Sequence, residues 1–211
     1  MSRLCPRRWG RWLVLSLVLV GVGGAAAGEE SPPAQVVRRL HDAYTSVLRE
    51  AKTLPYQGRY ERLAPAITEA FDLAFMARAV IGREWNQLSQ DDQARWVKAF
   101  TDFTIANYAA RLDHDSGQRF EFLGEQPGEN DTVMVMTRVV DPAAENVNLN
   151  YRLRQASGGW RIIDLYAKGT VSELALRRSE YASLIKSSGV EALIASLRRK
   201  VEDLAAGKTV D

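Results

Sequence analysis

Cysteine is almost absent from the sequence, which holds a single one, Cys5, among its 211 residues. Cys5 lies in a leading segment that we expect to be removed, so the mature protein should contain no thiol. This excludes disulfides, thiolate metal sites and a cysteine nucleophile. A domain without disulfides must be held by its own core, and the 184 remaining residues (211 − 27) are enough to bury one.

The leading segment has the three parts of a cleaved secretion signal. Four arginines and no acid precede Leu13, an apolar run extends from Leu13 to Val20, and Ala25-Ala26-Ala27 offers a small-residue cleavage site. The stretch from Leu13 to Ala27 is 15 residues, shorter than the roughly 20 that cross a bilayer, which favours cleavage over a retained anchor. We therefore expect residues 1–27 to be removed and residues 28–211 to form one domain, with a polar tether at its start and a frayed carboxyl end.

An excess of basic charge is missing once the signal is removed. The signal holds four of the 28 Lys and Arg residues and none of the 26 Asp and Glu residues. The mature chain therefore has 24 basic residues (28 − 4) against 26 acidic ones, a formal charge of −2. No basic patch remains for a nucleic acid or for a polybasic membrane contact, so we expect no nucleic-acid partner.

Hydrophobic periodicity predicts an α+β domain with helices at both ends and a sheet between them. Asp72 and Ser89 are placed as N-caps and Gly82 as a helix stop. Thr170-Val171-Ser172-Glu173 and Ser188-Gly189-Val190-Glu191 have the form of capping boxes that open two final helices. The predicted helices ahead of the sheet span residues 34–52, 59–70, 72–81 and 89–112. The predicted strands span residues 119–124, 132–141, 147–154 and 160–168, with turns short enough for a four-stranded antiparallel meander.

Motifs of catalysis are missing as well. The sequence has no G-x-S-x-G elbow, no H-E-x-x-H, no phosphate-binding glycine loop and no calcium loop. His41 stands within a predicted helix. His114 stands between two aspartates at a helix end, and we interpret it as a cation placed favourably at the carboxyl terminus of the helix and not as a metal ligand. We therefore predict no catalytic residue, no metal site and no cofactor.

What the sequence does have is apolar surface on the predicted sheet and helices. Val133-Met134-Val135-Met136 places apolar side chains on both faces of a strand, and the neighbouring helices add several aromatic residues. Methionine and aromatic side chains adapt to irregular apolar volumes, and ligand pockets are often lined in this way. A filled core and an open cavity share one pattern, so periodicity by itself leaves both interpretations open.

Three stretches resemble a known family. Residues 71–78, followed by Gly82 and Trp85, resemble the D-[FL]-x-x-M-A-x-x-x-x-G-x-x-W segment of the Mla-type periplasmic lipid carriers, the MlaC and toluene-tolerance family. Residues 150–154 and 158–164 are similar to the Y-R-L-x hairpin and the G-x-W-[KR]-[IV]-x-D strand of that family. Residues 169–181 lack the Asn-Tyr pair of MlaC proper and are similar to the hopanoid-associated HpnM branch.

The resemblance implies a twisted NTF2- or cystatin-like sheet packed against helices around an apolar lipid cavity. The implied protein is a periplasmic shuttle that carries a phospholipid or hopanoid between inner- and outer-membrane transport complexes and needs no catalytic residue. Each methylene moved out of water contributes about 0.8 kcal/mol, so release requires a partner that opens the cavity or competes for the lipid. Helix stripes and strand alternation predict a lipid-binding set of Phe75, Met76, Phe100, Phe103, Val133, Val135, Leu149, Tyr151 and Ile162.

Two alternatives stay open at this point. An NTF2-like hydrolase or isomerase would need an inward carboxylate, and Asp164 is the best candidate because alternation places it on one strand face with Trp160, Ile162 and Tyr166. A cargo-free adaptor of a transport complex would have the same fold and compartment.

Overall fold

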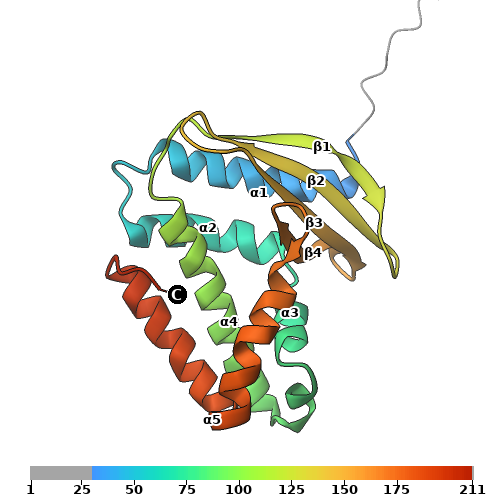
Figure 1. The fold of residues 1–211 in the computed structure, drawn as a ribbon, viewed down its shortest axis with the longest axis vertical. Coiled ribbons are helices and arrows are strands. Elements are labelled where there is room, and N and C mark those ends of the chain that lie inside the picture. Colours follow the sequence, from blue (N-terminus) through green and yellow to red (C-terminus); the bar gives the residue numbers. More distant parts are fainter. Residues whose placement is uncertain (1–29, 211) are drawn as a thin grey trace, which may run out of the picture.

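The computed structural model describes residues 30–210, so the predicted secretion signal lies outside the described residues. The described chain begins with four α-helices, continues through a sheet and ends in a long helix (Figure 1). The elements are α1 (Pro32–Arg49), α2 (Tyr56–Ala70), α3 (Leu73–Ile81), the 3-10 helix η1 (Gly82–Gln87), α4 (Gln90–Arg111), β1 (Arg119–Pro127), β2 (Thr132–Val140), β3 (Val147–Ala156), β4 (Gly159–Ala167), β5 (Val171–Ser172) and α5 (Glu173–Ala205).

The sheet is an antiparallel meander with strand order β1-β2-β3-β4-β5, which confirms the predicted α+β class. The two-residue β5, which pairs with the end of β4, was not predicted. β1 also continues past the predicted end at Gly124, because the register shifts between Phe122 and Gly124 and the bulge hides the alternation there.

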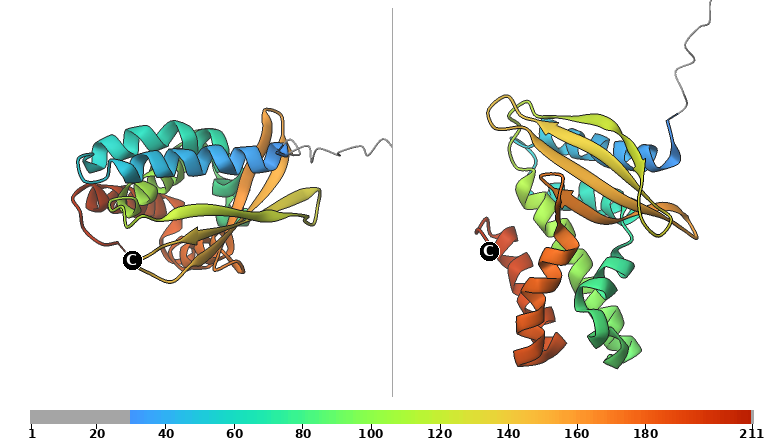
Figure 2. Two further views of the ribbon diagram at one scale, coloured as in Figure 1. Left: turned by 90° about the horizontal axis from the view of Figure 1, so that it is seen from above. Right: turned by 45° about the vertical axis from the view of Figure 1, so that its right-hand side comes forward.

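Two groups of helices pack around the sheet. α1 and α2 lie side by side and cover one face of the sheet, as the view from above shows (Figure 2). α3, α4 and α5 form a second group that extends away from the sheet (Figure 1). One continuous hydrophobic core joins both groups to the inner face of the strands.

The predicted caps are confirmed at two helices and displaced at a third. The Asp72 carboxylate accepts a hydrogen bond from Phe75 N at 3.0 Å, and the Ser89 hydroxyl accepts one from Asp92 N at 3.1 Å. At α5 the N-cap is Ser172, whose hydroxyl accepts from Ala175 N at 3.0 Å, and not Thr170 as predicted. The reason is that β5 draws Val171 and Ser172 into the sheet, so the helix begins after them.

The two predicted carboxyl-terminal helices are the two arms of α5. Gly189 interrupts the helix with φ 77° and ψ 175°, a left-handed backbone that glycine adopts without a Cβ penalty. The chain reverses there, and the arm after Gly189 runs back beside the first (Figure 1). Arg95 on α4 binds Glu191 through two contacts of 2.5 and 2.6 Å, which ties the second arm to α4 just after the break.

Candidate binding cavity

A cavity of about 240 Å³ lies between the inner face of the sheet and helices α1, α4 and α5. Its deep end is closed by buried side chains, among them Tyr44, Met76 and Phe100, whereas Arg111 at the other end is exposed. The cavity therefore opens where α4 ends and where β1 and α5 begin. The lining residues are Tyr44, Leu48, Phe71, Met76, Phe100, Thr104, Asn107, Tyr108, Arg111, Leu112, Gln118, Phe120, Val139, Leu149, Tyr151, Leu165, Ala167, Glu173 and Arg177.

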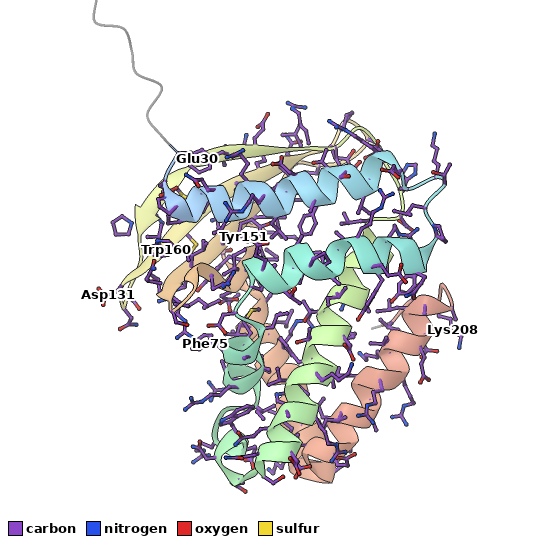
Figure 3. All side chains as sticks on the ribbon, turned by 180° about the vertical axis from the view of Figure 1, so that it is seen from behind. Glu30, Phe75, Asp131, Tyr151, Trp160 and Lys208 are labelled. Atoms are coloured by element: carbon purple, nitrogen blue, oxygen red, sulfur yellow. The ribbon has the colours of Figure 1, made fainter. Side chains whose placement is uncertain are left out.

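The predicted lipid-binding residues divide into a group that lines the cavity and a group that does not. Met76, Phe100, Leu149 and Tyr151 line it. Val135 and Ile162 are completely buried in the core, and Val133 packs against that core. The guanidinium carbon of Arg154 lies 4.0 Å from the ring centroid of Phe75, and that of Arg177 lies 5.2 Å from the ring centroid of Phe103. Figure 3 shows Phe75 on α3, away from Tyr151.

Several lining residues were not among those predicted. Tyr44 belongs to the apolar face predicted for residues 34–52, but no inward face was predicted for Phe120. The alternation predicted for residues 160–168 placed Leu165 opposite Ile162, and the bulge between these two residues turns Leu165 to the cavity side. No sequence pattern indicated that the polar residues Asn107, Arg111, Glu173 and Arg177 line a cavity, because a polar side chain on a helix usually faces solvent. Their position at the cavity depends on how α4 and α5 meet the sheet.

A hydrogen bond behind the cavity wall joins α1 to β3. His41 Nε2 and Tyr151 Oη are 2.9 Å apart, and the His41 ring stacks on Phe120 at 4.1 Å between centroids. Burial lowers the pKa of His41 from 6.5 to about 3, so the imidazole is neutral near pH 7. Burial also raises the pKa of Tyr151 well above its ordinary value. His41 and Tyr151 are therefore both uncharged near neutral pH.

Asp164, the candidate of the enzyme alternative, does not line the cavity. The register of β3 and β4 shifts so that Arg152 pairs with Asp164 while Leu153 pairs with Ile162. The prediction that Asp164 and Ile162 share a strand face is therefore wrong, because this bulge breaks the alternation between them. The Asp164 carboxylate instead accepts hydrogen bonds from Leu174 N at 3.1 Å and from the Ser172 hydroxyl at 2.6 Å, which fastens the start of α5 to β4.

Two further findings on the described residues concern metal-binding clusters and membrane-spanning helices. Within residues 30–210, no group of three or more His, Asp or Glu side chains is arranged to hold a metal ion. None of the helices in that same range is both long and apolar enough to cross a membrane.

Comparison with known proteins identifies the family. The sequence model of the family described as MlaC protein matches residues 38–199. The intermembrane phospholipid transport system binding protein MlaC of Haemophilus influenzae (strain ATCC 51907 / DSM 11121 / KW20 / Rd) is 19% identical over 205 residues, which cover 94% of this chain and 95% of that protein.

A solved structure shares the fold. The phospholipid-binding protein from Ralstonia solanacearum, determined in complex with a phospholipid, matches with a TM-score of 0.72 and 21% sequence identity. The match covers 83% of this chain and 99% of that chain. The family match spans most of the sequence and confirms the resemblance to the MlaC family: the chain belongs to the MlaC protein family.

Proposed function

We propose that this chain is a soluble periplasmic carrier that holds a phospholipid or hopanoid in the cavity and shuttles it between inner- and outer-membrane transport complexes, without catalysing a reaction. The observation that carries the proposal is a cavity lined by buried aromatic and methionine side chains, placed between sheet and helices in an MlaC-family fold. The related Haemophilus protein is named for phospholipid transport, and the Ralstonia protein was determined with a phospholipid bound.

The dimensions of the cavity bear on how cargo is loaded. Its volume of about 240 Å³ is below the roughly 300–1,000 Å³ of pockets that hold drug-sized ligands. Acyl chains or a polycyclic tail therefore require the walls to move apart on loading. Moving apolar surface from water into the widened cavity supplies the driving force, at about 0.8 kcal/mol for each methylene.

The α5 segment bears on the class of cargo. The stretch that is similar to the hopanoid-associated HpnM branch, residues 169–181, includes Glu173 and Arg177, and both line the cavity. A difference between branches in this segment would therefore reach the ligand directly. This supports keeping both a phospholipid and a hopanoid as candidate cargoes.

The deciding experiment is mass spectrometry of organic extracts from the protein, purified from its native periplasm without detergent. A stoichiometric phospholipid or hopanoid would establish the carrier function and name the cargo. Sequencing the amino terminus of the same sample should show cleavage after Ala27. A protein that purifies empty and takes up no lipid from liposomes would overturn the proposal, and an empty protein that still binds a membrane transport complex would favour the adaptor alternative.

A further inference from the structure

The lining of the cavity carries an excess of positive charge. Arg111 in the last turn of α4 and Arg177 in α5 both line the cavity, and Glu173 is the one acidic residue of the lining. Neither arginine forms an ion pair with a carboxylate of residues 30–210. Two guanidinium groups against one carboxylate leave a net charge of +1 in an otherwise uncharged lining.

Arg177 is held in place and stays charged. Its Nη1 donates a hydrogen bond to Tyr181 Oη at 3.3 Å, and its guanidinium carbon lies 5.2 Å from the Phe103 ring centroid. Burial lowers the pKa of Arg177, but Tyr181, Glu173 and Tyr108 raise it by more, so the group remains a cation. The hydrogen bond to Tyr181 uses one of five N–H donors, which leaves donors for a ligand.

The adjoining wall supplies a buried hydroxyl that lacks a hydrogen bond of normal length. Tyr44 lines the same cavity and is 3% exposed. Its hydroxyl makes no hydrogen bond of normal length to the described residues, and burial together with the nearby Tyr108 hydroxyl raises its pKa. The Tyr44 ring stacks on Tyr108 at 5.0 Å between centroids, and Tyr108 is close enough to Arg111 and Arg177 for both cations to act on its pKa. A buried hydroxyl is stabilised when a ligand supplies such a hydrogen bond.

We propose that Arg111 and Arg177 form a subsite for the phosphate group of an anionic phospholipid, with the Tyr44 hydroxyl available to the ester oxygens below it. Guanidinium groups bind phosphate oxygens through paired, charge-assisted hydrogen bonds. A phosphodiester carries one negative charge, which matches the net +1 of Arg111, Arg177 and Glu173. This inference rests on the proposed lipid binding and narrows its cargo, because a hopanoid or another neutral lipid cannot satisfy the two cations.

The test is a competition between two lipids with identical acyl chains. The mature protein is mixed with detergent micelles that contain equal amounts of dioleoyl phosphatidylglycerol and dioleoylglycerol, and the bound lipids are quantified by mass spectrometry. We expect the wild-type protein to prefer the phosphatidylglycerol by roughly tenfold or more, as hydrogen bonds to charged groups imply. Arg177→Gln and Arg111→Gln should each bring the ratio close to one.

The matched control is Arg178→Gln, an exposed neighbour on α5 that does not line this cavity and should keep the preference. Arg111 is exposed, so Arg111→Gln leaves the core intact even if Arg177→Gln fails to fold. Equal binding of both lipids by the wild type, or a preference that both variants retain, would overturn the subsite while lipid binding stands. Inorganic phosphate that binds at the same arginines without any lipid preference would also overturn it. A protein that takes up neither lipid overturns the carrier function itself.

Discussion

Asp72 and Arg154, which are 82 positions apart, form an ion pair of 2.7 Å between Oδ2 and Nη2 that joins the start of α3 to β3. The other oxygen of the same carboxylate caps α3 through Phe75 N, and the Asp72 N–H donates to the carbonyl of Ile162 at 2.8 Å. Three of the stretches that carry the family resemblance, residues 71–78, 150–154 and 158–164, therefore meet at one aspartate, which fastens helix to sheet.

Asp72→Ala should lower the free energy of unfolding by about 1–3 kcal/mol, because it removes a helix cap and leaves a half-buried guanidinium without its partner. Asp72→Asn retains an oxygen for the cap and should lose less. Urea denaturation followed by circular dichroism measures both. The control is Asp203→Ala at the exposed pair with Lys208, which should change stability by less than about 1 kcal/mol. Equal losses at Asp72 and Asp203 would contradict the assignment.

Protonation of His41 should make the protein less stable in mild acid. The pKa of the folded state is about 3 and that of the unfolded chain about 6.5, so the unfolded state binds the proton first as pH falls. Stability is complete above pH 6.5 and declines toward pH 3, by about 1.4 kcal/mol for each pH unit. Thermal unfolding between pH 5 and 7 should show the slope in the wild type and in His114→Gln, at the exposed histidine, and a flatter profile in His41→Gln. An unchanged slope in His41→Gln would refute this origin.

Leu149 and Val135 offer a test of whether lipid occupies the cavity, because Leu149 lies at the cavity and Val135 lies in the core. The sequence predicts that a charge at either position abolishes lipid content in a folded protein. The structure shows that the two positions are not equivalent. Leu149 lines the cavity and is partly buried, whereas Val135 is 0% exposed and does not line it.

Leu149→Asp should therefore give a folded protein with little bound lipid, while Val135→Asp should fail to fold because it buries an unpaired charge. Circular dichroism and lipid extraction of the two variants decide this. Full lipid content in a folded Leu149→Asp protein would show that cargo does not occupy this cavity.

Asp164 should contribute to stability and not to chemistry. Asp164→Ala removes the acceptor for Leu174 N and Ser172 and should lower the free energy of unfolding by about 1–3 kcal/mol. Asp164→Asn keeps one carbonyl oxygen and should lose less. Denaturation of both variants measures the effect, and lipid content per folded molecule should not change. A folded and fully stable Asp164→Ala protein that had lost its lipid would instead place Asp164 at the site.

The sequence by itself was sufficient for the main helices and strands and for the family, although β5 and the full length of β1 escaped it. The hydrophobic period of a helix or strand depends on which of its faces is buried, and it can be recognised from residues that are close together in the sequence. The caps at Asp72 and Ser89 are equally local, since each side chain bonds an amide three residues on. Motif order along the chain was enough to indicate the MlaC family, which the family match confirms.

The tertiary structure decided which inward residues reach the cavity and which fill the core. Val135 and Leu149 both belong to strands with an alternating pattern, yet Val135 is fully buried outside the cavity and Leu149 lines it, because the helices that pack over each position differ only in the tertiary structure. The bulge before Asp164 and the presence of Arg111 and Arg177 at the same cavity also depend on long-range packing, which no local pattern records. Hydrophobic periodicity indicates which side chains are buried. It does not separate a cavity wall from a packed core, because both bury the same kinds of side chain.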